Sequence, residues 1–254
     1  MASSGSKIRL FVNEGLKKDE SITLRGMQCH YLVHVMRTKA GDRIALFNGE
    51  DGEWQACVDR VGKNDCSLDV EDNLRPQGPE IGPWLAFAPL KKTRTQFVVE
   101  KATELGASRL WPVFTGRTMT DRVNLQRLRA HAIEAAEQCD RLTVPIVSEP
   151  SILGDLAAAW PADRELLVMD CGGHGRPLLD AMTAIGARVA EGRQQPPGLL
   201  VGPEGGFAKT ELDDLAALPF ATAVALGSRI LRAETAALSA LACWQAVVES
   251  QSKH

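Results

Sequence analysis

The stretch Leu199-Leu200-Val201-Gly202-Pro203-Glu204-Gly205-Gly206-Phe207 decides how this chain folds, together with a second stretch closer to the C-terminus. The second reads Ala225-Leu226-Gly227-Ser228-Arg229-Ile230-Leu231-Arg232-Ala233-Glu234-Thr235-Ala236. In each stretch an apolar strand stops at a glycine-bearing turn and leads into a helical pattern. Backbone can approach a ligand closely where no Cβ intervenes. The two stretches therefore predict two loops at one edge of a sheet that cradle a small ligand.

Around these stretches, apolar strands alternate with helical patterns. We expect strands at 84–88, 110–114, 146–147, 166–169, 199–201 and 223–226, and helices at 95–105, 125–139, 153–160, 178–188, 210–218 and 234–250. Such alternation is typical of a mostly parallel sheet covered by helices on both faces. Ligands of such sheets bind outside the carboxyl ends of the strands, which is where both glycine turns lie.

The first part of the chain has a different rhythm, with short strands joined by tight turns. We expect strands at 8–12, 21–24, 43–47, 53–58 and 66–70, and one helix near 28–37. Asn48-Gly49 is a strong hairpin signal. Residues 1–74 therefore predict a small β-barrel with one helix. The proline- and glycine-rich residues 75–83 predict a linker to an α/β domain over residues 84–254.

Composition excludes several classes of protein. Hydrophobic residues make up 44% of the 254 residues and charged residues 24%, as in ordinary soluble proteins. The polar start has no apolar signal core, so we expect a cytoplasmic protein. The six cysteines are scattered, which favours reduced thiols over disulfides or a zinc site. His30 and His34 stand four positions apart, but no second ligand cluster supports a metal site, and we expect none.

The charge is unevenly distributed. The net charge is -3, but residues 91–141 contain 10 lysines and arginines against 6 acidic residues. A basic surface there could contact phosphates while the whole chain stays acidic. The alternative is a solvated helix face.

The two glycine loops carry different chemistry. In the first, Pro203 fixes φ and Glu204 can accept hydrogen bonds, although a plain strand-to-helix turn explains the loop equally well. The second places Ile230 and Leu231 where a structural turn would be polar, so they could sandwich a flat base. Glu234 suits the first helical turn and could simply be a cap. A third glycine-rich stretch, 168–175, lacks the dinucleotide-binding spacing but could border the same ligand.

Taken together, the motifs resemble those of the SPOUT methyltransferases, and more specifically the RsmE family, which methylates N3 of a uridine in 16S ribosomal RNA. The resemblance rests on both glycine loops, on His34-Val35-Met36-Arg37 with Gly41-Asp42, on Lys101 to Gly106, and on Ala135-Ala136-Glu137-Gln138-Cys139. It covers nearly the whole chain. One departure is Asp140, where the family more often has glycine before the arginine.

The resemblance implies a PUA-like barrel followed by a SPOUT domain with a deep trefoil knot, which is a rare chain topology. It also implies a homodimer that binds S-adenosylmethionine in the knot and acts on 16S ribosomal RNA or the assembled small subunit. On this reading Met169, Gly202, Pro203, Glu204, Gly205, Gly206, Leu226, Gly227, Ile230, Leu231, Thr235 and Ala236 bind the cofactor.

The same reading assigns the remaining site residues. Arg94, Glu137, Arg232 and Glu234 serve the reaction, although helix packing explains Glu137 equally well. Arg9, Arg37, Lys91 and Lys92 contact RNA. Two alternatives stay open: a related knotted methyltransferase that acts on another RNA nucleotide, and a non-catalytic dimeric RNA-binding protein.

Overall fold

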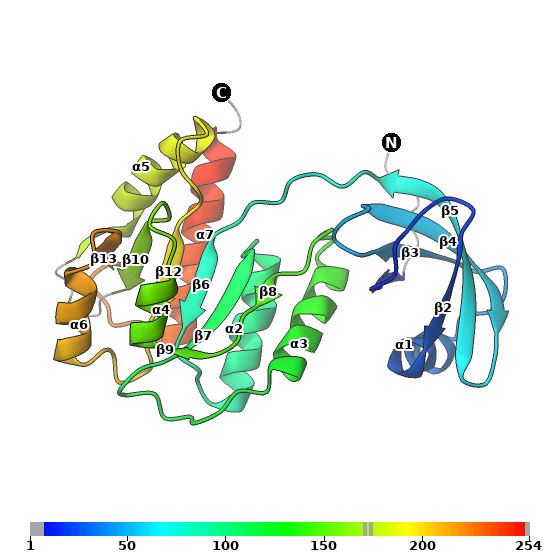
Figure 1. The fold of residues 1–254 in the computed structure, drawn as a ribbon, viewed down its shortest axis with the longest axis horizontal. Helices are drawn as coiled ribbons and strands as arrows, with labels where there is room; N and C mark the ends of the chain where they lie inside the picture. The colour runs from blue at the N-terminus through cyan, green and yellow to red at the C-terminus, as the bar shows by residue number, and fades with distance from the viewer. Residues whose placement is uncertain (1–7, 170–171, 173–174, 252–254) are drawn as a thin grey trace. The chain divides into compact units, whose positions relative to one another are not determined.

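The computed structural model describes residues 8–169, 172 and 175–251. The chain divides into two compact units (Figure 1). One comprises Met1–Glu80 with Ala136–Val144 and is called the β unit here; the other comprises Ile81–Ala135 with Pro145–His254 and is called the α/β unit. The second segment of the β unit is the end of a helix and the loop after it, so the chain crosses between the units more than once.

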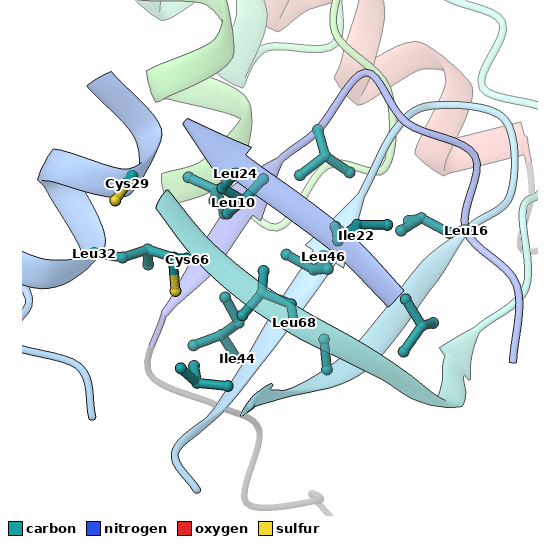
Figure 2. Close-up of a cluster of buried hydrophobic side chains, with 14 residues drawn as sticks. Leu10, Leu16, Ile22, Leu24, Cys29, Leu32, Ile44, Leu46, Cys66 and Leu68 are labelled. Atoms are coloured by element: carbon teal, nitrogen blue, oxygen red, sulfur yellow. The ribbon is translucent and has the colours of Figure 1, made fainter. Parts of the chain in front are cut away.

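The β unit is one curved sheet with the strand order β1-β3-β4-β5-β2. Its strands are β1 (Arg9–Phe11), β2 (Ser21–Arg25), β3 (Arg43–Phe47), β4 (Glu53–Val61) and β5 (Asp65–Arg75). β1 and β3 are parallel, and the other pairs are antiparallel. Ile22 and Leu24 alternate with exposed residues along β2, as expected for a strand with one buried face. Figure 2 shows the apolar core that these strands enclose.

The helix expected near 28–37 begins and ends two residues earlier in the structure. Helix α1 (Gly26–His30) continues into a π-helical turn, η1 (Tyr31–Val35). It ends because Arg37 adopts a φ of 56°, which is a left-handed conformation. The Thr38 hydroxyl then donates a 2.9 Å hydrogen bond to the Leu32 carbonyl and closes the turn.

The α/β unit is built on a sheet with the order β11-β13-β10-β12-β6-β7-β8, in which every neighbouring pair of the described strands is parallel. Its strands are β6 (Trp84–Phe87), β7 (Arg109–Phe114), β8 (Ile146–Val147), β9 (Ser151–Ile152), β10 (Leu166–Met169), β11 (Arg176–Pro177), β12 (Gly198–Val201) and β13 (Ala221–Ala225). Its helices are α2 (Lys92–Glu104), α3 (Leu125–Gln138), α4 (Leu153–Ala159), α5 (Leu178–Ala190), α6 (Lys209–Ala216) and α7 (Ala233–Gln251). The last residues of α3 belong to the β unit.

Helices cover both faces of this sheet. Val168 and Leu200 face one side and form a cluster with Leu156 of α4 and Leu215 of α6. The next residues along the strands, such as the paired Leu167 and Leu199, point to the opposite face because side chains alternate along a strand. On that face α7 packs against β12, α2 and α5. Both faces are buried, which explains why the central strands are apolar throughout.

The predicted fold class is confirmed: a mostly parallel sheet with helices on both faces, preceded by a small β domain. The sequence analysis missed β9 and β11, which have two residues each. The trefoil knot stays a prediction.

Candidate active site

A cavity of about 750 Å³ opens at the carboxyl edge of the parallel sheet. Met169, Val201 and Ala225 are the last residues of β10, β12 and β13, and all three line it. The rest of the lining comes from Arg117, Gly172, Gly175, Pro177, residues 202–207, Leu212, residues 226–233 and Ala236. The two glycine loops therefore form walls of a single cavity.

Glycine is needed at specific points of this wall. Gly227 has a φ of 112°, a backbone conformation that residues with a Cβ rarely adopt. Gly202 packs against the ring of Phe207, and a Cβ on Gly202 would lie 3.0 Å from that ring. A Cβ on Gly175 would lie 2.7 Å from the backbone of Val224 in β13. One glycine thus provides an unusual backbone angle, and two provide close contact.

A three-residue ion-pair cluster adjoins the cavity. The Arg94 side chain on α2 donates a 3.3 Å hydrogen bond from Nη1 to Oε1 of Glu204, which lines the cavity. Its Nε lies 3.6 Å from Oε1 of Glu234 at the start of α7. The other oxygen of Glu234, Oε2, is buried and has no hydrogen-bond partner among the described residues. An unsatisfied buried acceptor is costly, so this oxygen is available for a ligand or solvent donor.

The start of α2 concentrates positive charge. Lys91 and Lys92 are exposed there, Arg94 follows, and the first turn contains no acidic residue. Cations are unfavourable at a helix N-terminus because that end already carries partial positive charge. The Thr95 hydroxyl, which contacts the Leu90 backbone at 2.9 Å, holds this turn without a carboxylate. These cations destabilise the start of the helix, but together with the helix N-terminus they favour the binding of an anion there.

The structure brings together most of the residues predicted to bind the cofactor. Those that line the cavity are Met169, Gly202, Pro203, Glu204, Gly205, Gly206, Leu226, Gly227, Ile230, Leu231 and Ala236. Thr235 is exposed on the first turn of α7 and is not among the described lining residues. Of the residues assigned to the reaction, Arg232 lines the cavity, and Arg94 and Glu234 adjoin it through their ion pairs.

Arg9 and Glu137 lie in the β unit, in a buried network. The Arg9 side chain, only 10% exposed, bonds Glu53 and donates to the carbonyls of Ala136 and Glu137 at 2.9 and 3.0 Å. Oε1 of Glu137 accepts a 2.9 Å hydrogen bond from the Phe11 backbone. These contacts attach the end of α3 to the sheet of the β unit. Arg9 and Glu137 therefore have structural roles in the β unit. Arg37, which was also predicted to contact RNA, is exposed.

The departure from the family pattern at Asp140 has a simple backbone explanation. Asp140 has a φ of 60°, in the left-handed region. Glycine is the usual residue there, and aspartate is among the few others that tolerate it. The Asp140 carbonyl accepts a 3.0 Å hydrogen bond from Arg75, so the turn is also anchored to the β unit. The substitution preserves the turn that glycine would make.

The sequence analysis missed several lining residues, most notably Arg117. Arg117 lies in the turn after β7 and reaches the first glycine loop. The only available signal was its place after a strand of the parallel sheet. Gly172 and Gly175 of the third glycine-rich stretch also line the cavity; residues 170, 171, 173 and 174 of that stretch lie outside the described residues.

Metal-binding and membrane-spanning features are absent from the part of the chain that the structure describes. It contains no group of three or more histidine, cysteine or acidic residues that could hold a metal ion. No described helix is both long and apolar enough to cross a bilayer. Cys29, Cys57, Cys66, Cys139 and Cys243 are free thiols, and Cys171 lies outside the described residues.

Comparison with known proteins places the chain in a family. Residues 80–245 match the model of an RNA methyltransferase domain, and residues 24–71 match that of an RNA methyltransferase PUA domain. Ribosomal RNA small subunit methyltransferase E of Rickettsia conorii is 32% identical over 92% of this chain and 93% of its own length. The chain belongs to the RsmE family of RNA methyltransferases.

Other relatives extend the comparison. The RsmE of Bacillus subtilis (strain 168) is 27% identical over 89% of this chain and 90% of its own length. The crystal structure of RsmE from Neisseria gonorrhoeae bound to S-adenosylmethionine matches with a TM-score of 0.83 and 25% identity. That match covers 94% of this chain and 97% of the other. This RsmE family member therefore shares both domains with its relatives.

Proposed function

We propose that this protein uses S-adenosylmethionine to methylate N3 of a uridine in 16S ribosomal RNA. The observation that carries the proposal is the cavity formed by both glycine loops, with Arg94 tied to its wall through Glu204. A small-molecule pocket lies next to a cationic residue and a basic helix terminus. This combination suits an enzyme that joins a small donor to a polyanion.

The cavity residues fit S-adenosylmethionine. The cavity volume of about 750 Å³ is within the usual range for small-molecule sites. Met169, Val201, Phe207 and Leu226 provide apolar surface for an adenine ring, and the glycine loops provide backbone donors and acceptors. When bound, S-adenosylmethionine supplies an electrophilic methyl group on a sulfonium.

The side chains beside the cavity suit the acceptor base. The N3 position of uridine is a weakly acidic imide, so the base becomes anionic when N3 loses its proton. A guanidinium next to the base would stabilise that charge. Arg232, which lines the cavity, and Arg94, which is bonded to its wall, would fill this role. Glu204 and Glu234 hold Arg94 by ion pairs of 3.3 and 3.6 Å and would limit its rotamers.

The RNA contacts follow from exposure and charge. Lys91 and Lys92 at the start of α2, and Arg37 of the β unit, are exposed cations that phosphates can reach. The guanidinium of Arg9 is already bonded to Glu53 and to backbone carbonyls. Arg9 would therefore maintain the shape of the β unit that binds RNA rather than contact the RNA itself. Glu137 would act in the same indirect way.

The active form is a homodimer in the cytoplasm, with the knotted loops at the interface. Ile230 of the second glycine loop is 86% exposed. A large apolar side chain at the edge of a binding site is a natural intermolecular contact. Light scattering on the purified protein tests the dimer, and Ile230→Asp should shift it toward the monomer.

A methyl-transfer assay decides the function. The protein is incubated with radiolabelled S-adenosylmethionine and small-subunit RNA that lacks the uridine methylation, and the modified nucleotide is mapped. Label on uridine N3 supports the proposal. Label on another nucleotide supports a related activity of the same fold. RNA binding with neither cofactor binding nor label identifies a non-catalytic RNA-binding protein.

A further inference from the structure

The turn after β7 folds back onto the first glycine loop. Nη1 of Arg117 donates a 2.8 Å hydrogen bond to the Gly205 carbonyl, and Arg117 itself lines the cavity. The turn is closed locally because the Thr115 backbone donates to the Thr118 hydroxyl at 2.9 Å. A segment 88 positions away in sequence thus reaches the loop proposed to bind the cofactor.

Glu211 fastens the same turn from the other side. Its Oε1 accepts a 2.7 Å hydrogen bond from the Gly116 backbone, and its Oε2 accepts one of 2.7 Å from the Ala208 backbone. Glu211 therefore caps the start of α6 and holds the turn with the same carboxylate. The turn after β7 is therefore held at two points, to the glycine loop through Arg117 and to the start of α6 through Glu211.

The stem of Arg117 lies against Gly205. A Cβ on Gly205 would lie 3.4 Å from Cβ and 3.5 Å from Cδ of Arg117. Gly205 is not among the glycines with a positive φ. Neither the backbone angle nor the space around Gly205 therefore excludes a Cβ, and the contact with Arg117 that distinguishes Gly205 is the hydrogen bond to its carbonyl.

We propose that Arg117 is a positioning residue that sets the shape of the cofactor loop through Gly205. The inference rests on the proposed function, since it concerns the same cavity. Arg117 holds the Gly205 carbonyl in one orientation and packs its stem against the loop. The loop then presents its backbone groups to S-adenosylmethionine without a prior rearrangement, and preorganisation of this kind raises affinity.

Calorimetric titration with S-adenosylmethionine tests the role. Arg117→Ala should weaken cofactor binding about tenfold, the size expected for a hydrogen bond from a charged donor. The methyl-transfer rate at saturating cofactor and the affinity for RNA should stay within about twofold, so the loss appears in KM rather than kcat. Arg117→Lys should recover part of the affinity because a lysine can still donate to the carbonyl.

Arg122→Ala is the matched control. Arg122 lies on the same connection between β7 and α3, is exposed, and makes the same charge change on mutation. It does not line the cavity among the described residues. Its loss should leave the affinity for S-adenosylmethionine unchanged.

Gly205→Ala tests whether the backbone carbonyl is the partner that matters. The added Cβ would lie 3.4 Å from Cβ and 3.5 Å from Cδ of Arg117, which is ordinary van der Waals contact, and the carbonyl that Arg117 holds is kept. Its affinity for S-adenosylmethionine should therefore stay within about twofold of that of the natural chain, in contrast to the loss in Arg117→Ala.

Three outcomes overturn the inference. Unchanged cofactor affinity in Arg117→Ala removes the role. A loss of RNA affinity alone identifies Arg117 as a phosphate contact, and a loss of cofactor affinity in Gly205→Ala as large as in Arg117→Ala shows that space at the loop, rather than the hydrogen bond to the Gly205 carbonyl, is the cause. If the natural chain itself fails to bind S-adenosylmethionine, the proposed function fails instead, so the two failures are distinguishable.

Discussion

Arg94 on α2 and Glu204 on the first glycine loop are joined by a 3.3 Å hydrogen bond, although 110 positions separate them in sequence. The contact ties the basic start of α2 to the wall of the cavity. We expect Arg94→Gln to lower the methyl-transfer rate about 100-fold, because it removes a preorganised positive charge from the proposed site of the acceptor base. Single-turnover kinetics measure this rate.

Arg94→Lys is the companion variant, since it retains the charge but loses the planar fork. It should lose less activity than Arg94→Gln. Affinity for S-adenosylmethionine should stay within about threefold in both variants, because the proposed role of Arg94 is to act on the RNA base. An equal loss of cofactor affinity and rate would contradict this division of roles.

Gly227→Ala should weaken cofactor binding. The new Cβ would meet no atom within 4 Å, but the backbone φ of 112° would be strained. Strain of this kind costs about 1–3 kcal/mol, and the loop would relax away from its present shape. Calorimetry with S-adenosylmethionine measures the affinity.

Gly192→Ala separates strain at the cavity from strain elsewhere. Gly192 follows α5, has a φ of 68°, and is likewise open around its missing Cβ. The Gly192→Ala substitution should lower the melting temperature slightly and leave cofactor affinity unchanged. If Gly227→Ala and Gly192→Ala weaken S-adenosylmethionine binding equally, the loss in Gly227→Ala does not come from strain at the cavity.

Lys91→Ala and Lys92→Ala should flatten the salt dependence of RNA binding. Removing one phosphate contact should reduce the slope of log K against log salt by roughly 0.7 to 0.9. Fluorescence anisotropy at several salt concentrations measures the slope.

Lys101 on the same helix is the matched control. Hydrogen bonds that Lys101 donates to Glu100 and Glu104 raise the pKa of Lys101 to about 12, so it is charged but already paired. Lys101→Ala should leave the salt slope unchanged. A slope that falls equally for all three lysines would mean that the helix acts through its overall charge.

Glu53 in the β unit should make stability depend on pH. Burial alone would raise the pKa of Glu53, but hydrogen bonds from Arg75 and Arg9 outweigh it and hold the pKa below its usual value of 4.5. The charged carboxylate therefore stabilises the fold above that value, and the contribution is lost as the pH falls through the lower, folded-state pKa. Glu53→Gln should cost roughly 3 kcal/mol at neutral pH, as for other broken buried pairs.

Urea unfolding at neutral and acid pH checks this prediction. The difference in unfolding free energy between the natural chain and Glu53→Gln should shrink as the pH falls below 4.5. Glu71→Gln is the control, since Glu71 pairs with the exposed Arg43 and should cost less than about 1 kcal/mol. A constant difference across pH would show that the charge of Glu53 is not the cause.

The sequence by itself determined the frame of the site. Apolar strands that end in glycine turns, alternating with helices, specify a parallel sheet, and parallel strands place their carboxyl ends at one edge. This is why residues around Gly202 and Gly227 could be assigned to one cavity before any contact was known.

Only the tertiary structure decided which charged side chains serve that cavity. Arg9 looked like an exposed cation but is buried against Glu53, and Glu137 holds the backbone of Phe11. The only signal for Arg117 was its place after a strand, yet it reaches Gly205. Periodicity reports which face of an element is apolar, whereas the partner of a long charged side chain depends on segments that packing brings together from far along the chain.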